Sequence, residues 1–456
     1  MGDTLPMKKL NNFKTFDRVV GISGNQKLSM ENKTLKIIEL FAGVGGFRLG
    51  LEGYKGKSSL SGYKKSLNNK TQFKVVYSNQ WEPSTKIQHA SMVYEHRFGK
   101  EGHFNSDISE LSVKELKEKC DVLVGGFPCQ DYSVANSLRT SKGLLGKKGV
   151  LWWQIERILS DLGKNKPKFL ILENVDRLIK SPVNKRGRDF AVMLASLNDL
   201  GYTVEWRVLN AAEYGLPQRR RRVFIVGYLN STEIEKQRKK VNPIDWIESD
   251  GVLGNGFPCN SKELQDEFEI KGDLESISKN YGSDKGKSIF HNSGISSNRK
   301  VITIDVKPSE VNYETTLADI LIDSKEVEEE FWIDSKDLKK WEIEKGAKKK
   351  ERISASGHTY TFSEGGMNFP DLLDLPSRTI ITSEGGKSPS RFKHVVEQKG
   401  KFRRLTPVEL ERLNMFPDNF TNLEVVNNTK RAFLMGNALV VGIIEKIGVS
   451  LTSFLK

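Results

Sequence analysis

Cys129 stands in the segment GGFPCQDYS, residues 125–133, directly after the short apolar run 121–124. A buried strand that ends at a rigid Pro128 would place this thiol at the mouth of the strand. The thiolate is the nucleophilic form of cysteine, and nearby cations at a strand-end turn lower the thiol pKa below its free value of about 8.5. A free cysteine taken alone is more often a small buried hydrophobe. The position after a strand favours nucleophilic chemistry instead.

Five further blocks occur in a fixed order along the chain. They read IIELFAGVGGFRLGLE (37–52), ENV (173–175), QRRRRVFIVG (218–227), RRLTPVELERLNMFPDNF (403–420) and GNALVVGII (436–444). Together with the cysteine segment, this ordered set resembles the DNA (cytosine-5)-methyltransferase family. The resemblance covers about residues 33–229 and 377–456 and leaves the middle of the chain unmatched.

The resemblance implies methyl transfer to carbon 5 of cytosine, which is a poor nucleophile. A thiolate must therefore add first at carbon 6, and Cys129 is the residue for that step. The adduct carries negative charge on N3 and O2 of the ring, which a positioned acid and a cation stabilise. We expect Glu173 at N3 and the exocyclic amine, and Arg222 at O2. The other catalytic residues that the resemblance implies are Pro128, Gln130, Asn174 and Arg220.

These assignments have simpler alternatives. Glu173 alone could be a surface carboxylate that caps a helix, and the arginines of 219–222 could form a solvated basic patch. Their positions beside successive predicted strands, together with the resemblance, favour the catalytic interpretation. Because side chains alternate along a strand, Arg219 and Arg221 should point away from the site.

S-adenosylmethionine is the methyl donor that the resemblance implies, and no metal is expected. Glycines at 43, 45 and 46 let the backbone approach a ligand closely, but Arg48 stands where a dinucleotide fingerprint needs its third glycine. We expect Phe41 and Trp81 to cover the adenine faces and Asp107 to accept from its amino group, although Phe41 could equally be a core residue. The remaining expected cofactor residues are Ala42, Gly43, Gly45, Gly46, Ile108, Leu151 and Asn437.

One cofactor position departs from the family pattern. The acidic residue that holds the ribose hydroxyls aligns with Gln80, so either Gln80 or the nearby Glu82 is expected to take this role.

DNA contacts are expected outside the catalytic pocket. A duplex hides carbon 6 in the base stack, so the target base must be flipped out. Residues 130–150 resemble the mobile loop of the family, and Lys142, Lys147 and Lys148 would meet phosphates. The alternative is a solvated loop without contacts. Thr379 matches a family position that contacts the backbone beside the target.

Composition sets broad limits. The 456 residues are 37% hydrophobic, enough for one large core and a smaller one. A net charge of +14 gives modest support to a polyanionic partner. The odd set Cys120, Cys129 and Cys259 has no C-x-x-C spacing, which fits a reducing compartment. No uninterrupted apolar stretch approaches the ~20 residues of a membrane span, so we expect a bacterial cytoplasmic protein with no membrane contact.

Predicted strands at 36–41, 75–78, 121–124, 169–172 and 223–226 alternate with helical segments, which favours an α/β class with ligands at the carboxyl ends of a parallel sheet. The resemblance implies a Rossmann-like, S-adenosylmethionine-dependent methyltransferase fold with a mostly parallel sheet and a smaller, irregular target-recognition domain. The predicted parts are a flexible extension (1–33), the catalytic and cofactor-binding domain (34–229), the target-recognition domain (230–402), a hinge with the RRLTP segment (403–430) and a return to the catalytic domain (431–456).

The resulting hypothesis is a monomeric, site-specific DNA cytosine-5 methyltransferase of bacterial modification type. Its expected partner is double-stranded DNA, with a possible cognate restriction endonuclease acting on the same site. One alternative is a transfer-RNA cytosine-5 methyltransferase of the same fold, which the long segment 230–376 disfavours. The other is a non-catalytic DNA-binding regulator, which Cys129, Glu173 and Arg222 disfavour.

Overall fold

The computed structural model describes residues 34–54, 72–127, 151–182, 185–281, 287–353, 357 and 359–455. The predicted extension at 1–33 and several predicted site residues lie outside these ranges. Those site residues are Pro128, Cys129, Gln130, Lys142, Lys147 and Lys148.

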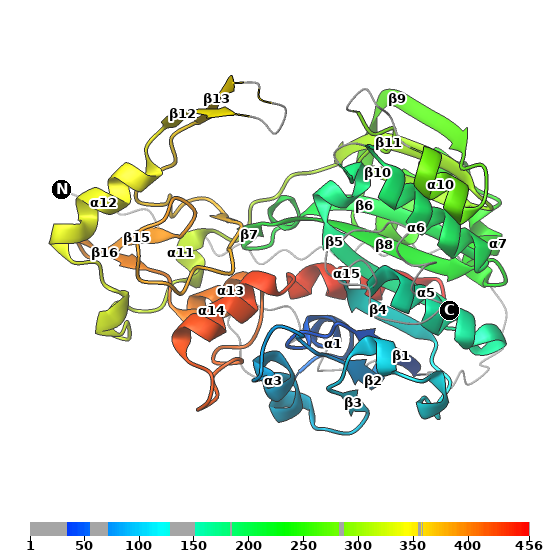
Figure 1. The fold of residues 1–456 in the computed structure, drawn as a ribbon, viewed down its shortest axis with the longest axis horizontal. Helices are drawn as coiled ribbons and strands as arrows, with labels where there is room; N and C mark the ends of the chain where they lie inside the picture. The colour runs from blue at the N-terminus through cyan, green and yellow to red at the C-terminus, as the bar shows by residue number, and fades with distance from the viewer. Residues whose placement is uncertain are drawn as a thin grey trace, which may run out of the picture. The chain divides into compact units, whose positions relative to one another are not determined.

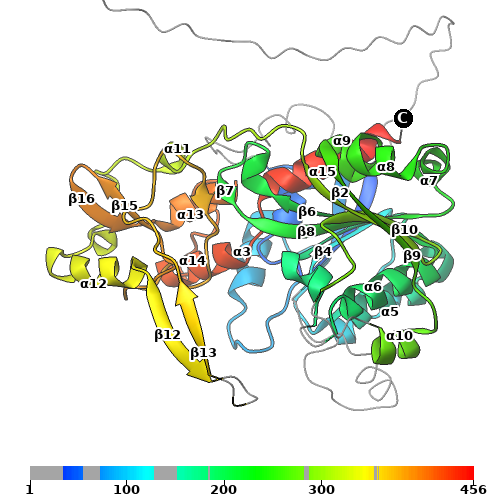
Figure 2. The ribbon, with the colours of Figure 1, turned by 90° about the horizontal axis from the view of Figure 1, so that it is seen from above.

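A ten-stranded sheet forms the centre of the chain (Figures 1 and 2). In spatial order its strands are β3 (His103–Phe104), β2 (Phe73–Asn79), β1 (Leu35–Leu40), β4 (Val122–Gly126), β5 (Phe169–Val175), β8 (Arg221–Leu229), β6 (Tyr202–Asn210), β10 (Ser293–Ser297), β11 (Lys300–Pro308) and β9 (Cys259–Glu269). The pairs from β3 to β5 are parallel, and β8 enters antiparallel between β5 and β6. Strands β8, β10 and β9 run against all the others. The predicted α/β class with a mostly parallel sheet is confirmed.

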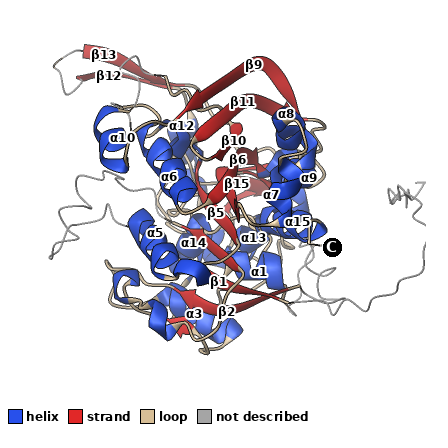
Figure 3. Cartoon of the chain, turned by 90° about the vertical axis from the view of Figure 1, so that its right-hand side faces the viewer, coloured by secondary structure: helices blue, strands red, loops and turns tan. Residues whose placement is uncertain are grey.

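The parallel strands are nearly continuous apolar runs because helices cover both faces of the sheet (Figure 3). One face carries α1 (Gly46–Glu52), α15 (Val441–Ser453) and the short α7 (Glu233–Arg238), α8 (Pro243–Asp245) and α9 (Val252–Gly256). The other face carries α5 (Leu151–Asp161), α6 (Arg188–Asp199) and α10 (Leu274–Asn280). Helix α3 (His89–Phe98) follows β2.

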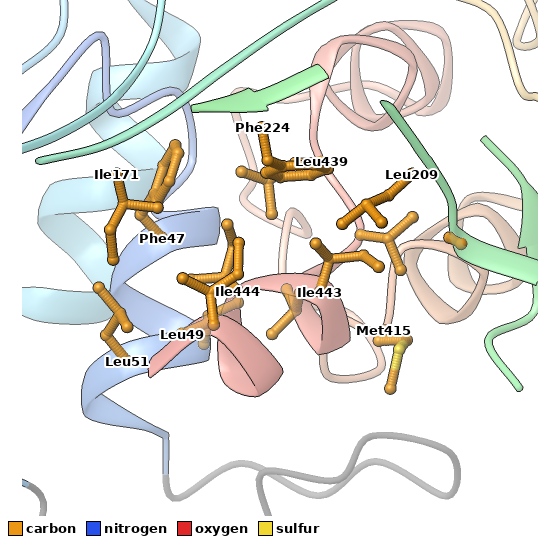
Figure 4. Close-up of a cluster of buried hydrophobic side chains, with 14 of the residues drawn as sticks. Phe47, Leu49, Leu51, Ile171, Leu209, Phe224, Met415, Leu439, Ile443 and Ile444 are labelled. Carbon is orange, nitrogen blue, oxygen red and sulfur yellow. The ribbon is translucent and has the colours of Figure 1, made fainter. Parts of the chain in front are cut away.

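Helices α1 and α15 pack closely, although they come from opposite ends of the chain (Figure 4). Phe47 and Leu49 lie beside Ile443 and Ile444 in one buried cluster. Gly50 permits this approach, because a Cβ added there would lie 2.7 Å from Cβ of Ile444. The carboxyl-terminal helix therefore completes the core beside the first strand.

The stretch Asn428–Ser453 is long and apolar enough to span a membrane by length and composition, which the sequence analysis did not expect. It comprises α14 (Asn428–Asn437) and α15, with a non-helical break at 438–440. In its most apolar window, 61% of the residues are buried within the chain. Core packing explains its apolar character.

Residues 259–308 supply β9, β10 and β11, which extend the central sheet beyond β6. The sequence analysis placed these residues in the target-recognition domain and expected few regular elements there. Strand β9, CNSKELQDEFE, is a charged edge strand without apolar alternation, so its pairing with β11 had no periodic signal. The edge of this sheet thus lies well beyond the predicted boundary at residue 230.

The segment from 309 to 404 contains smaller elements. They are α11 (Leu317–Ile320), α12 (Ser335–Lys345), the hairpin of β12 (Lys348–Ile353) and β13 (Thr359–Glu364), β14 (Ser377–Arg378), and the hairpin of β15 (Val395–Gln398) and β16 (Lys401–Arg404). Strand β14 pairs in parallel with β7 (Gln218–Arg219), which precedes β8. Helix α13 (Pro407–Leu413) follows, and the buried Arg403–Glu409 pair, 2.6 Å apart, ties it to β16.

Candidate active site

A cavity of about 1630 Å³ opens at the carboxyl ends of the parallel strands. The parallel register aligns Leu40 with Asn79 and Gly125, and Gly126 with Glu173, so the carboxyl ends of β1, β2, β4 and β5 meet at one edge of the sheet. The cavity walls contain most of the described residues that the sequence singled out. They are Phe41, Ala42, Gly43, Gly46, Gln80, Trp81, Glu82, Asp107, Ile108, Leu151, Glu173, Asn174, Arg220, Arg222 and Asn437.

Glu173 and Arg222 face each other in this cavity. Strands β5 and β8 run antiparallel and pair Val175 with Arg222, which brings the guanidinium across to the carboxylate. Nε of Arg222 lies 3.0 Å from Oε1 of Glu173, and both side chains are largely buried. Burial raises the pKa of Glu173 above its ordinary value, although Arg222 and Arg220 oppose the shift. An acid and a cation are thus held side by side.

Arg220 and Asn174 support the wall behind this pair. The buried Arg220 donates to the Ile380 carbonyl at 3.2 Å and to the Gly436 carbonyl at 2.8 Å, so it joins β8 to two later segments. Asn174 donates to the Phe127 carbonyl at 2.8 Å. This hydrogen bond holds Phe127, which follows the end of β4 and precedes Cys129 by two residues. Arg219 and Arg221 are exposed on the alternate side.

The glycine turn after β1 bends sharply to form the floor of the cavity. Phe41 has φ 55° and Gly43 φ 57°, both in the left-handed region. A Cβ added at Gly43 would meet no atom within 4 Å, so the turn faces open space there. Gly45, at φ 91°, lies under the turn and not in the cavity wall, and a Cβ at this position would approach the Phe98 ring to 2.3 Å. Gly43 therefore faces the cavity, whereas the lack of a side chain at Gly45 permits packing against Phe98.

Gln80 and Glu82 contact different parts of the structure. Oε1 of Gln80 accepts a 2.7 Å hydrogen bond from the Gly43 amide, so this side chain braces the glycine turn. The peptide of Glu82 is held by Gln88, whose Oε1 accepts from the Glu82 amide at 2.7 Å and whose Nε2 donates to the Glu82 carbonyl at 2.9 Å. The Glu82 carboxylate lies 3.7 Å from Nζ of Lys430. The Gln80 side chain is thus engaged by the turn, whereas Glu82 lines the cavity as a carboxylate.

Glu39 was missed by sequence reasoning, although a carboxylate inside the apolar run IIEL was a usable signal. It is fully buried; Oε1 accepts from the Arg48 amide at 3.3 Å and Oε2 from the Tyr94 hydroxyl at 2.8 Å. Helix α1 has Gly45 as its N-cap residue and no side-chain cap, so Glu39 supplies an acceptor to its first turn. Burial raises the pKa of Glu39 to about 7. Glu39 therefore holds the start of α1, directly after the glycine turn.

The remaining cofactor residues fit a nucleoside. Trp81 is 37% exposed and lines the cavity with Phe41, so aromatic surface is available for an adenine. One carboxylate oxygen of Asp107 accepts from the Ser109 amide at 2.9 Å, which orients the carboxylate. Asn437 is exposed at the end of α14. The open glycine turn, the aromatic surface and the acidic acceptors suit S-adenosylmethionine.

Thr379 lies outside the cavity wall. Its hydroxyl donates to the Arg219 carbonyl at 2.6 Å, which joins the end of β14 to β7, just before Arg220 and Arg222. Within the part of the chain that the structure describes, no group of three or more His, Cys, Asp or Glu side chains is placed to hold a metal ion.

Comparison with known proteins identifies the family. Residues 35–453 match the family described as C-5 cytosine-specific DNA methylase. The chain is 46% identical over 421 residues to Type II methyltransferase M.Sau3AI of Staphylococcus aureus, covering 91% of this chain and 94% of that relative. It is 35% identical over 250 residues to Type II methyltransferase M.HaeII of Haemophilus aegyptius, covering 54% and 66%.

Solved structures show the same fold. A methyltransferase of Entamoeba histolytica superposes with a TM-score of 0.53 at 16% identity, covering 93% of this chain and 99% of that one. The Dnmt2 methyltransferase of S. pombe gives 0.51 at 15% identity, covering 92% and 98%. The chain therefore belongs to the C-5 cytosine-specific DNA methylases, and its enzymatic activity is DNA cytosine-5 methylation.

Proposed function

We propose that this enzyme is a site-specific modification methyltransferase that acts on a cytosine flipped out of duplex DNA. The observation that carries the proposal is the Glu173–Arg222 pair, held 3.0 Å apart in the cavity that also contains the glycine turn. The similarity to a Type II methyltransferase over 91% of the chain supports a bacterial role in protecting cytoplasmic DNA from a cognate endonuclease. A family match over nearly the whole chain favours DNA over transfer RNA, and catalysis over a regulatory role.

In the proposed mechanism, the thiolate of Cys129 adds to carbon 6 of the flipped cytosine. The electron pair of the C5–C6 double bond moves into the ring, toward N3 and O2. Glu173 in its protonated form donates to N3, which its raised pKa favours. Arg222 donates to O2 and stabilises the charge that develops there. Both groups are already in place, so little reorganisation accompanies the addition.

As a member of this family the enzyme uses S-adenosylmethionine, which supplies an electrophilic methyl group when bound. Phe41 and Trp81 would contact the adenine, and Glu82 would accept from the ribose hydroxyls. After methyl transfer, Glu173 takes back the proton from N3. A water molecule accepts the proton of carbon 5 as the thiolate of Cys129 leaves, which restores the C5–C6 double bond.

Bisulfite sequencing tests the function directly. DNA from cells that express the enzyme should carry 5-methylcytosine at one short recurring sequence, and DNA from cells that express Cys129→Ala should carry none. Methylation scattered without a shared sequence would contradict site specificity. Methylated transfer RNA with unmodified DNA would contradict the duplex substrate.

A further inference from the structure

The loop that carries Glu82 contacts the carboxyl-terminal part of the chain. Helix α3 follows this loop, and α14 lies near α3 (Figures 1 and 2). Arg97 of α3 donates to the Asn419 and Phe420 carbonyls, each at 2.7 Å, in the connection between α13 and α14. A second contact joins Glu82 itself to α14, because Nζ of Lys430 lies 3.7 Å from the Glu82 carboxylate. The cofactor loop is thus tied to α14 by a direct ion pair.

The backbone of Lys430 is fixed by contacts that do not involve its side chain. The Asn427 side chain caps α14 by accepting from the Lys430 amide at 2.9 Å. The next residue, Arg431, is buried, and its Nη2 donates to the Glu411 carboxylate at 3.0 Å, which binds α14 to α13. The ammonium group of Lys430 therefore extends from an anchored turn of helix.

The ammonium group of Lys430 is held from two sides. Its Nζ lies 4.3 Å from the centroid of the Phe433 ring, one turn further along α14, as well as 3.7 Å from the Glu82 carboxylate. A cation is attracted both to an aromatic face and to a carboxylate. The Lys430 side chain is only 19% exposed, and both of its partners line the main cavity. Lys430 thus lies behind the cavity wall, in contact with two residues that form it.

The direction of the Glu82 side chain depends on this pair. Gln88 holds the Glu82 peptide at both its amide and its carbonyl, so the backbone at this position is fixed. The carboxylate itself is 21% exposed, and Lys430 is the ion-pair partner that the described residues give it. With the backbone fixed, the partner of the side chain decides where the carboxylate lies.

A nearby cation also helps Glu82 to keep its charge when a ligand covers it. A nucleoside in the cavity would remove the water that still reaches the carboxylate. Burial disfavours an ionised carboxyl group unless an opposite charge or hydrogen bonds compensate for the lost water. The ammonium of Lys430 supplies such a charge. The carboxylate can then accept charge-assisted hydrogen bonds from both ribose hydroxyls, which are stronger than bonds to a neutral amide.

We infer that Lys430 is a positioning residue for the cofactor, whose ammonium group holds the Glu82 carboxylate in place for the ribose hydroxyls. In this role Lys430 acts through Glu82 and does not touch the cofactor. Helix α14 thereby contributes to cofactor affinity at the ribose, in addition to the contact expected of Asn437. The inference rests on the proposed function, because it takes Glu82 as the residue that accepts from the ribose.

Variants of the two paired residues test this role. Lys430→Gln removes the cation, Lys430→Arg keeps it, Glu82→Gln removes the carboxylate, and a double variant combines Lys430→Gln with Glu82→Gln. The matched control is Lys236→Gln, which removes an exposed ion pair in α7, where Lys236 lies 2.5 Å from Glu233. The contacts of Arg97 remain in every variant, so α3 and the segment before α14 should stay joined.

Calorimetric titration with S-adenosylhomocysteine measures affinity without turnover. Lys430→Gln should bind it about threefold to tenfold more weakly than the parent, whereas Lys430→Arg and the control should stay within about twofold. The loss in the double variant should equal that in Glu82→Gln alone, because Lys430 acts through Glu82. An analogue that lacks both ribose hydroxyls should bind equally to the parent and to Lys430→Gln.

Steady-state kinetics give a second readout. In Lys430→Gln the KM for S-adenosylmethionine should rise by a similar factor, whereas kcat at saturating cofactor should change by less than about twofold. This split is expected because the ribose hydroxyls take no part in the methyl transfer itself.

Parent-like affinity in Lys430→Gln would overturn the inference, and a lower melting temperature with that result would assign Lys430 to stability alone. A loss that adds to that of Glu82→Gln, or that persists with the analogue lacking the hydroxyls, would also contradict it. Tighter binding by Lys430→Gln would show that the pair draws the carboxylate away from the ribose. Failure of the proposed function appears separately, as absent methylation of DNA by the parent, and the binding comparison would stand in that case.

Discussion

Nε of Arg222 lies 3.0 Å from Oε1 of Glu173, across the antiparallel pair of β5 and β8. The guanidinium of Arg222 and the carboxylate of Glu173 contact each other when no base is in the cavity. The entering cytosine must therefore exchange one charge-assisted contact for contacts with its own N3 and O2. The pair is pre-positioned for the transition state more than for binding.

Arg222→Ala should lower kcat by about a hundredfold to a thousandfold, the usual cost of a lost charge-stabilising donor. Duplex affinity should change by less than about threefold, because the partner of Arg222 is the flipped base and not a phosphate. Single-turnover kinetics and anisotropy measure the two quantities. Equal losses in both would favour a simple basic patch. Glu173→Gln should show the same split between turnover and affinity.

Cys129→Ala should abolish both methyl transfer and covalent trapping on 5-fluorocytosine DNA. Cys259→Ala is the matched control, because GFPC occurs at 126–129 and again at 256–259. Cys259 is buried, and burial raises its thiol pKa, so it is a poor nucleophile. Denaturing electrophoresis detects the adduct. An adduct that survives in Cys129→Ala and disappears in Cys259→Ala would reverse the assignment.

Glu39 should make stability depend on pH. Its pKa is about 7 in the folded chain against an ordinary 4.5, so between these values the folded state holds a proton that the unfolded state has released. Stability should fall as pH rises through this window, by up to about 1.4 kcal/mol per pH unit. Glu39→Gln should remove that slope in urea denaturation.

The charged and titratable groups around Glu39 are Arg48, Tyr94 and Glu52. Glu52→Gln is the control, because Glu52 is partly exposed and is paired with the Arg48 side chain at 2.6 Å. This variant should keep the parental slope. An identical pH profile for the parent and Glu39→Gln would show that Glu39 stays ionised when buried.

Glu82→Gln should weaken S-adenosylmethionine about fivefold to tenfold, since a carboxylate accepts stronger hydrogen bonds from hydroxyls than an amide does. Gln80→Glu should also weaken it, because a new charge would stand near Glu82 while Gly43 keeps its acceptor. Calorimetric titration of both variants decides between the two positions. Tighter binding by Gln80→Glu would place the ribose at residue 80.

We expect residues 309–404 to determine which DNA sequence the enzyme methylates. Grafting this segment into a relative with another target should transfer the methylated sequence, because the catalytic blocks face a cytosine that all members share. A graft that begins at 230 should fail to fold, since it would separate β9, β10 and β11 from β6. Bisulfite maps report the target. A folded and active 309–404 graft that keeps the target of its host would refute this domain assignment.

Local patterns in the sequence were enough to predict the fold class. Short apolar runs that are followed by glycines, by Cys129 or by Glu173, or preceded by Arg222, indicate buried strands with functional ends, because a strand covered on both faces needs continuous apolar residues. The alternation of these runs with helices limited the sheet to a mostly parallel one. Sequence motifs alone also pointed to the family.

Only the tertiary structure decided contacts between segments that share no local signal. Gln80 reaches Gly43, and Arg391 joins the two ends of the β12–β13 hairpin, through hydrogen bonds to backbone groups, which any sequence presents alike. Strand β9 joins the sheet although its residues are charged, because pairing with β11 satisfies its backbone. Burial of Glu39 depends on how α1 and α3 close over β1. These contacts depend on how the whole chain packs, and the local periodicity of the sequence carries no information about that packing.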